Sequence, residues 1–184
     1  MAHLNAMLLL AISYKKKVNM EQVTFQGNPV KVVGSIPTVG SQAPDFSLTA
    51  SDLSDLTLSS FKGQNVIINI FPSIDTPVCA SSVKKFNEEA SKLKNTTVLC
   101  VSADLPFAVG RFCEVEGVEN VQHASTFRNS DFAEAYGVLI PEGALRGLVT
   151  RAIVCVNTDG KVTHSELVKE ITDEPTYSLA LNAF

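Results

Sequence analysis

The pattern of apolar and polar positions predicts a strand, a helix and a second strand in the middle of the chain. Residues 65–71 form a short, β-branched and mostly apolar run, which is typical of a central strand covered on both faces. Residues 97–102 form another such run. Between them, over residues 77–93, apolar side chains recur at alternating spacings of four and three, which places them on one face of a helix: Cys79, Val83, Phe86, Ala90 and Leu93. This part of the chain therefore predicts a βαβ unit with a right-handed crossover.

Shorter patterns predict the other elements. An N-terminal β-hairpin is expected from residues 23–26 and 30–33, and a second hairpin from residues 151–156 and 162–168 around the turn Asn157-Thr158-Asp159-Gly160. The remaining predicted elements are a surface linker at 34–44, strands at 45–48 and 56–58, and helices at 106–116, 130–136 and 175–181.

A βαβ unit followed by a β-hairpin and a final helix is the thioredoxin-like order of elements. The expected fold class is therefore α/β, as a three-layer sandwich with a central mixed sheet and an added N-terminal β-hairpin. No internal repeat or low-complexity segment interrupts this order.

Composition and charge exclude several classes of function. A chain of 184 residues with 45% hydrophobic content buries an ordinary core and most simply forms one domain. The net charge is −4 and the 15 basic residues are scattered, so no basic stripe is available for nucleic acid. No apolar run approaches the length that spans a membrane.

The N-terminus is expected to lie outside the fold. Residues 6–12 are apolar and are followed by Lys15-Lys16-Lys17, the reverse of the order in a secretory signal. Residues 1–19 are therefore interpreted as an extension before a second methionine, Met20, with a targeting segment as the alternative. The catalytic domain is expected over residues 20–184, and the expected location is the cytoplasm.

The segment between the first strand and its helix carries the candidate chemistry. Thr76 is a good N-cap and Pro77 suits the first helical position, so Cys79 falls in the first turn, where backbone N–H groups lack intrahelical acceptors. These donors and the helix dipole favour a thiolate. The CxxC motif of thioredoxin-type oxidoreductases is replaced here by Thr76-Pro77-Val78-Cys79. A hydroxyl near a single thiolate suits attack on a bound peroxide, which would leave a sulfenic acid on Cys79.

Several separated motifs give the chain a resemblance to a known family. The spacing of Pro72, Thr76 and Cys79 is the peroxiredoxin active-site pattern. The motifs that follow in family order are residues 102–107, 111–113, 125–128 and 147–152. Over nearly all of residues 20–184 the sequence resembles the thiol peroxidase branch of the peroxiredoxins, of the atypical two-cysteine type. The chain departs from that pattern in residues 1–19 and at Cys155.

The resemblance implies a role for each site residue. Cys79 would be the peroxidatic cysteine and Cys113 the resolving cysteine, and the two would form an intramolecular disulfide. Thr76 and Arg151 would complete the catalytic pocket, and Pro72 would shield it. The resemblance further implies hydroperoxides as substrates with organic ones preferred, thioredoxin as the reductant, a homodimer, and no metal, haem or flavin cofactor.

Residue chemistry alone leaves alternatives open. Cys79 and Cys113 could each be a small buried hydrophobe, and Arg151 could be a solvated charge at a strand end. Cys100 and Cys155 have apolar neighbours and are expected to lie in the core. A peroxide sensor or relay that passes its oxidation to a partner would use the same cysteines, and a thioredoxin-like holdase would use none of them.

Three further expectations concern the surroundings of the cysteines. His3, His123 and His164 are dispersed and lack ligand spacing to any cysteine, so no metal site is expected. Phe71, Ile74 and Val78 are expected to line an apolar mouth. Cys79 and Cys113 are expected to lie apart in the reduced state, in helices that unwind locally to let the disulfide form, and Gly110 and Gly117 are expected to weaken the Cys113 helix.

Overall fold

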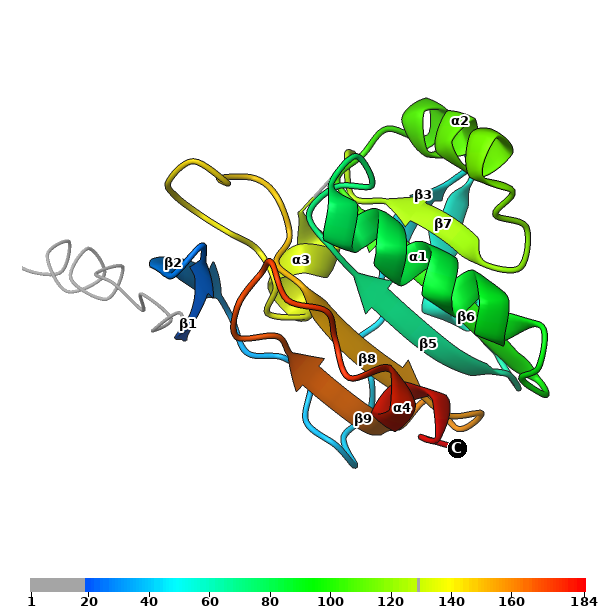
Figure 1. Ribbon diagram of the computed structural model, residues 1–184. Helices are drawn as coiled ribbons and strands as arrows, with labels where there is room; N and C mark the ends of the chain where they lie inside the picture. Colours follow the sequence, from blue (N-terminus) through cyan, green and yellow to red (C-terminus); the bar gives the residue numbers. More distant parts are fainter. Residues whose placement is uncertain (1–18, 129) are drawn as a thin grey trace, which may run out of the picture.

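The computed structural model describes residues 19–128 and 130–184, which form the predicted three layers (Figure 1). Within these residues a seven-stranded mixed sheet has the order β4-β3-β7-β6-β5-β8-β9. The strands of this sheet are β3 (Ser47–Ala50), β4 (Asp55–Thr57), β5 (Asn65–Ile70), β6 (Thr96–Ser102), β7 (Gln122–Ser125), β8 (Ala152–Val156) and β9 (Val162–Leu167). β5 and β6 pair in parallel and β8 and β9 pair as an antiparallel hairpin, which confirms the βαβ unit and the second hairpin.

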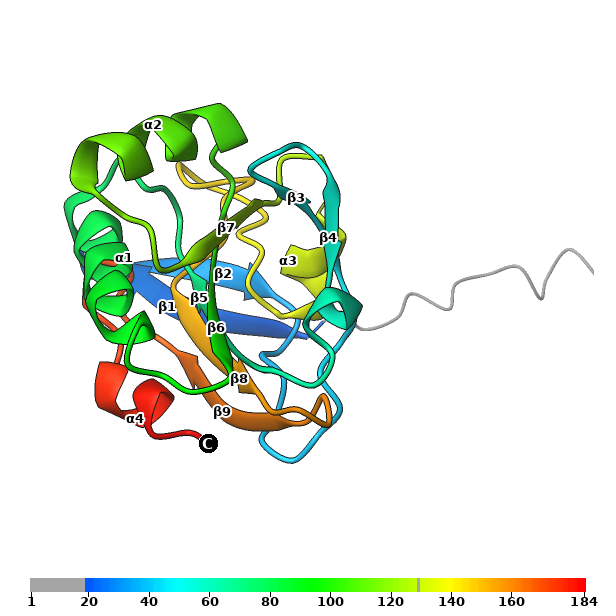
Figure 2. The ribbon, with the colours of Figure 1, turned by 90° about the vertical axis from the view of Figure 1, so that its right-hand side faces the viewer.

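Helices cover both faces of the sheet. They are η1 (Leu58–Phe61, a 3₁₀ helix), α1 (Pro77–Ala90), α2 (Pro106–Glu116), α3 (Asp131–Ala135) and α4 (Tyr177–Leu181). Figure 2 shows α1 and α4 on one side of the sheet and α3 on the other. The fold class is therefore confirmed as a mixed α/β sandwich.

The central strands are buried on both faces, as their apolar runs predict. Along β5, Ile68 belongs to the core beneath α3, whereas Ile67 belongs to the core beneath α1 and α4. On β8, Val154 and Cys155 divide in the same way. This alternation follows from the pleat of the strands, which points successive side chains to opposite faces.

The N-terminal hairpin consists of β1 (Met20–Phe25) and β2 (Asn28–Val33). The prediction for residues 1–19 lies outside the described residues except at Asn19, whose carbonyl accepts a hydrogen bond from the backbone N–H of Gly34.

After β2 the chain passes close to Gly137, where an added Cβ would come within 2.2 Å of the Ser35 carbonyl carbon. Only glycine suits that position, since its φ is +63° as well.

Several details of the structure differ from the prediction. The strand expected at 45–48 begins two residues later, and the helix expected to reach Leu93 ends at Ala90. Strand β7 was not predicted, because its sequence Gln-His-Ala-Ser has neither an apolar run nor β-branched residues. Gly117 does not weaken α2 from within: it is the C-cap, with φ 67°, so it ends the helix.

Candidate active site

The candidate nucleophile Cys79 lies in the first turn of α1, where the chain leaves the carboxyl end of β5. Thr76 has the extended backbone of an N-cap and Pro77 is the first helical residue, as predicted. The Thr76 side chain makes no capping bond, however. Its hydroxyl donates to the Ser73 carbonyl at 3.0 Å instead. The backbone turn at residues 73–76, rather than a side-chain cap, therefore sets the entry to the helix.

Arg151 lies against Cys79, although 72 residues separate them in the chain. The guanidinium Nη2 donates to the Cys79 sulfur at 3.2 Å, and Nε donates to the Ile171 carbonyl at 2.9 Å. Arg151 is 1% exposed and Cys79 0% exposed, so the alternative of a solvated arginine is wrong. A permanently charged guanidinium in a buried site stabilises an anionic sulfur.

The third guanidinium nitrogen is a free donor. Arg151 Nη1 is buried and has no hydrogen-bond partner among the described residues. Buried donors without partners are costly and uncommon in folded proteins. Such a donor beside a nucleophile suits an oxygen atom brought by a substrate.

Pro72 and Thr76 lie in the loop that covers the nucleophile. Pro72 is buried, consistent with a shielding position, and Thr76 is exposed. Among the described residues no hydrogen bond joins the Thr76 hydroxyl to the Cys79 sulfur. Because that hydroxyl donates its proton to Ser73, its oxygen lone pairs remain available to accept a proton from another group.

Asp104 holds this loop in place, a role that sequence reasoning missed. Its carboxylate accepts hydrogen bonds from the Ser73 hydroxyl at 2.7 Å and the Ile74 backbone N–H at 2.6 Å. The Ser102 hydroxyl donates to the same carboxylate at 2.8 Å. The segment 102–107 was recognised as a motif, but only the fold shows that it meets residues 73–74 at the ends of β5 and β6.

Cys113 lies on α2 and is partly buried. All four cysteines are free thiols, so the structure represents the reduced chain. The Cys113 sulfur lies 3.2 Å from His123 Nε2 on β7, a contact that the dispersed histidines of the sequence gave no reason to expect. His3 lies outside the described residues.

Cys100 and Cys155 are buried in the sheet, as predicted. Burial raises the pKa of each thiol to about 12. Both therefore remain protonated at neutral pH, and their thiols make only long contacts of 3.7 Å, with the Asn69 side chain and the Ala180 carbonyl respectively. Neither has the features of a reactive cysteine.

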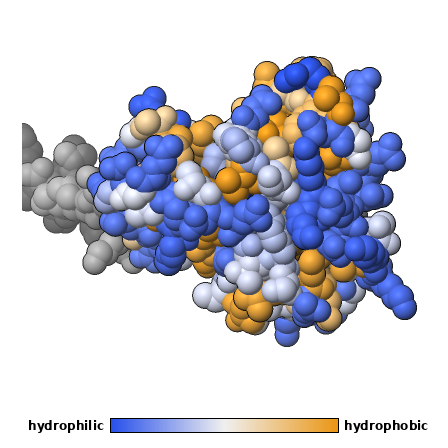
Figure 3. Space-filling view, in the orientation of Figure 1, coloured by the Kyte–Doolittle hydropathy of each residue, from blue (hydrophilic) through white to orange (hydrophobic). Residues whose placement is uncertain are grey.

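A groove of about 360 Å³ runs between the start of α1 and α2. Its lining residues are Ile74, Asp75, Thr76, Pro77, Ala80, Arg111, Phe112, Val115 and Glu116. The predicted apolar mouth is therefore partly wrong: Ile74 lines the groove, but Phe71 and Val78 do not, and Phe71 is 1% exposed and belongs to the core. Phe112 and Val115, on α2, supply apolar surface to the groove instead, and Figure 3 shows apolar side chains gathered over α2.

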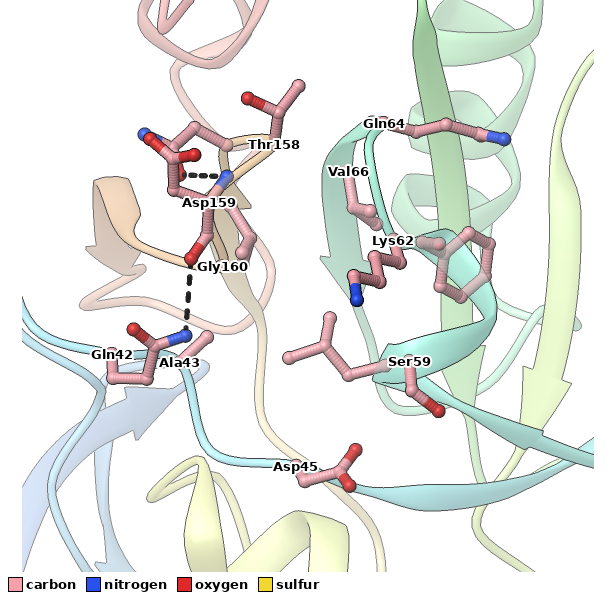
Figure 4. Close-up of a pocket in the computed structure, with 14 residues that line it drawn as sticks. Gln42, Ala43, Asp45, Ser59, Lys62, Gln64, Val66, Thr158, Asp159 and Gly160 are labelled. Carbon is pink, nitrogen blue, oxygen red and sulfur yellow. Dashed lines mark hydrogen bonds between the residues drawn. The ribbon is translucent and has the colours of Figure 1, made fainter.

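Another cavity, of about 560 Å³, lies at the opposite end of β5 (Figure 4). The β8–β9 turn, with Asp159 and Gly160, forms one wall, and the segment around Lys62 and Val66 forms the other. No cysteine and no arginine lines it. Cys79 lines neither cavity, but the groove is lined by Thr76 and Pro77 of the turn that carries Cys79, so the groove is the better candidate for substrate.

The described residues also bear on two other classes of site. No helix among them is long and apolar enough to cross a membrane. No group of three or more potential metal ligands comes together in the same part of the chain.

Comparisons with known proteins agree with this geometry. The family model described as Redoxin matches residues 38–181. The chain therefore belongs to the Redoxin family, as a member of the peroxiredoxins. Thiol peroxidases of Mycobacterium bovis and Mycobacterium tuberculosis are each 54% identical to it over 164 residues, which cover 89% of this chain and 98% of theirs. Its activity is accordingly the thiol-dependent reduction of peroxides.

Solved structures place it in the same family. A peroxiredoxin-like protein from Aquifex aeolicus is 44% identical with a TM-score of 0.83, and the match covers 89% of this chain and 96% of that one. A thiol peroxidase from Chromobacterium violaceum shares the fold with a TM-score of 0.80 at 24% identity, over 85% of this chain and 91% of that one.

Proposed function

We propose that Cys79 is the peroxidatic nucleophile and that Arg151, Thr76 and Pro72 form its pocket. The observation that carries the proposal is the buried hydrogen bond from Arg151 Nη2 to the Cys79 sulfur at the first turn of α1. A cation and a helix N-terminus both favour a thiolate, the reactive form of cysteine. Two independent sources of positive potential therefore converge on one sulfur.

The oxidation step follows from these positions. The Cys79 thiolate attacks the distal oxygen of ROOH, so that an S–O bond forms, the O–O bond breaks and RO⁻ leaves to take up a proton. The Cys79 sulfur is oxidised to sulfenic acid and the peroxide is reduced to alcohol. The free donor Arg151 Nη1 suits a peroxide oxygen, and the Thr76 oxygen suits the peroxide hydrogen.

Cys113 is proposed as the resolving cysteine. Its thiol condenses with the Cys79 sulfenic acid to form an intramolecular disulfide and water. A dithiol reductant, which we propose to be thioredoxin, then returns both cysteines to thiols. The location of Cys113 near the end of α2, on a partly exposed face, supports this role.

A cytoplasmic homodimer is the proposed working form. Leu105, Phe107 and Phe127 are exposed apolar side chains. The Ser125 hydroxyl donates to the Asp104 carbonyl, which brings the segments that carry these side chains together. The resulting apolar surface supports an interface between two subunits. A reducing compartment suits a cycle that must return its cysteines to thiols.

A coupled assay tests the function directly. Peroxide consumption is followed as NADPH oxidation through thioredoxin reductase and thioredoxin, with H₂O₂ and cumene hydroperoxide as substrates. Turnover that is lost in Cys79→Ser and kept in Cys155→Ser supports the proposal. A single stoichiometric oxidation without turnover would favour a sensor or relay, and no reaction of Cys79 with peroxide would favour a binding module.

A further inference from the structure

Cys113 and His123 form a pair that the cycle above does not explain. Cys113 Sγ lies 3.2 Å from His123 Nε2, within the range of a hydrogen bond to sulfur. Among the described residues, neither the Cys113 side chain nor the His123 side chain makes another hydrogen bond. The two residues come from different elements, α2 and β7, so the fold rather than local sequence brings them together.

The pair lies apart from the peroxide groove. Cys113 and His123 line a cavity of about 580 Å³, whose other side is lined by Ala50, Asp52 and Leu56 among others. The groove beside Thr76 is lined from α2 by Phe112 and Val115 but not by Cys113. The resolving sulfur is therefore docked on His123 in the reduced chain, away from the surface that receives peroxide.

Both members of the pair are neutral at pH 7. Burial lowers the pKa of His123 to about 4, and burial raises the pKa of the Cys113 thiol. The other titratable groups around the imidazole are Asp52, which lines the same cavity from the β3–β4 turn, and the protonated thiol of Cys100, the neighbour of His123 on β6. A neutral imidazole next to a thiol has one nitrogen that can accept a proton.

We propose that His123 is a further catalytic residue, which accepts the Cys113 proton as α2 begins to open, so that Cys113 leaves as a thiolate and attacks the Cys79 sulfenic acid. The proposal rests on the proposed roles of Cys79 and Cys113. In the attack, an S–S bond forms and the S–O bond of the sulfenic acid breaks. The Cys113 sulfur is oxidised, the Cys79 sulfur is reduced, and the departing hydroxide takes a proton from solvent to leave as water, while His123 returns the proton it accepted to solvent.

The low basicity of the docked imidazole has a function in this scheme. While α2 is closed, proton transfer to His123 is unfavourable, so Cys113 stays a thiol and is not itself oxidised by peroxide. As α2 begins to open, water reaches the ring while the contact with Cys113 persists, and the pKa of His123 returns toward the ordinary value of about 6.5. The base thus becomes effective just before Cys113 is released, and thiolate formation is coupled to the motion.

Rapid-quench mass spectrometry after one equivalent of cumene hydroperoxide tests the proposal. Dimedone traps the Cys79 sulfenic acid and N-ethylmaleimide traps free thiols. His123→Gln keeps a hydrogen-bond acceptor but cannot take a proton. We expect this variant to form the sulfenic acid at the wild-type rate and to form the disulfide at least about tenfold more slowly. This loss is smaller than is usual when a general base is removed, because a thiol is already weakly acidic. His164→Gln, on β9, is the matched control.

The pH profile separates a base from a structural contact. The wild-type rate of disulfide formation should level off above about pH 6.5, the ordinary histidine pKa, whereas the His123→Gln rate should keep rising as Cys113 ionises. If His123→Gln folds poorly, His123→Ala with added imidazole gives the same information, since a base can then be supplied through the adjoining cavity. Recovery of the rate by imidazole supports the proposal.

Two outcomes would count against it in different ways. Disulfide formation in His123→Gln with the wild-type rate and pH profile would overturn the role of His123 alone. A wild-type chain that never forms a Cys79 sulfenic acid would overturn the proposed function on which that role rests.

Discussion

Arg151 donates a hydrogen bond to the Cys79 sulfur in a site where neither side chain is exposed to solvent. The arginine is held in turn by the Ile171 carbonyl, and the Ile171 N–H donates to Thr24 in β1. The N-terminal hairpin therefore supports the segment that positions the guanidinium. The hairpin, which is an addition to the thioredoxin-like core, is connected to the proposed catalytic pocket by two hydrogen bonds.

Arg151→Met should lower the rate of Cys79 oxidation by at least about a hundredfold, since removing one donor of an anion-stabilising site costs about 10²–10³ in rate. Stability should change much less. Cys79 packs as a small hydrophobe, and the main cost is the unpaired Ile171 carbonyl, about 1–3 kcal/mol. Single-turnover oxidation and urea unfolding measure the two effects, with the exposed Arg146→Met as the control. Near-normal oxidation in Arg151→Met would show that the guanidinium is not needed.

Thr76→Val should reduce kcat/KM for peroxide by about 10–100-fold, the equivalent of a hydrogen bond to a charged or reacting group. The free energy of unfolding should hardly change, because the Thr76 hydroxyl makes no capping bond and its extended backbone suits valine. Thr76→Ser keeps the hydroxyl and should retain most activity. Steady-state kinetics of the two variants separate the hydroxyl from the methyl group, and equal activity in both would remove Thr76 from the mechanism.

Val115→Ser should weaken the reaction with cumene hydroperoxide more than that with H₂O₂. Val115 is 73% exposed and lines the groove beside Thr76, so it can cover an alkyl or aryl group, and each buried methylene contributes about 0.8 kcal/mol. Val39→Ser is the matched control, since Val39 is 63% exposed but does not line the groove. An equal loss for both peroxides would indicate that this groove does not select the substrate.

The sequence predicted the catalytic turn better than its surroundings, for a physical reason. Cys79, Thr76 and Pro77 lie within four residues, and local rules for helix starts place them correctly. The Arg151 contact and the Asp104 bonds to residues 73–74 depend on which strands become neighbours. Such long-range pairing leaves no periodic signal in the sequence.

The errors around the site have the same origin. Phe71 and Val78 flank the motif, but neither lines the groove, and Phe71 is turned into the core. His123 lies on a strand whose polar sequence gave no strand signal, so its contact with Cys113 could not be anticipated. Gly117 was expected to weaken the helix that carries Cys113, whereas it caps the end of that helix.

His123 should make the fold less stable as the pH falls from about 6.5 to 4. In that range the unfolded chain binds a proton at this residue and the folded chain does not, because burial lowers the folded pKa to about 4. Stability therefore rises with pH across this window, by up to about 3 kcal/mol from this one group. Urea unfolding at pH 7.5 and 4.5 should show a smaller difference for His123→Gln than for wild type. The same difference in both proteins would mean that His123 is protonated equally in the two states.

Formation of the Cys79–Cys113 disulfide should open α2 in its last turns. A disulfide requires the two Cα atoms to come within roughly 7 Å, and in the reduced chain Cys113 is docked on His123 in a cavity separate from the groove. The Cys113 carbonyl accepts the N–H of Val118 at the C-cap, so its segment lies next to the helix end. The ion pairs that tie α2 to the α1 region, Lys84–Glu116 and Arg111–Asp75, are exposed and contribute little. The cost of opening is therefore small.

Hydrogen exchange on the reduced and oxidised forms measures this motion. Oxidation should speed exchange in residues 76–82 and 107–117 and leave β5 and β6 unchanged, since those strands are paired on both sides in the centre of the sheet. Cys113→Ser treated with the same peroxide is the control, because it can form the sulfenic acid but not this disulfide. If α2 opens only when the disulfide forms, the variant keeps the slow exchange of the reduced chain in residues 107–117. Equal protection in the reduced and oxidised wild type, with a mass map that places the disulfide elsewhere, would contradict both the pairing and the opening of α2.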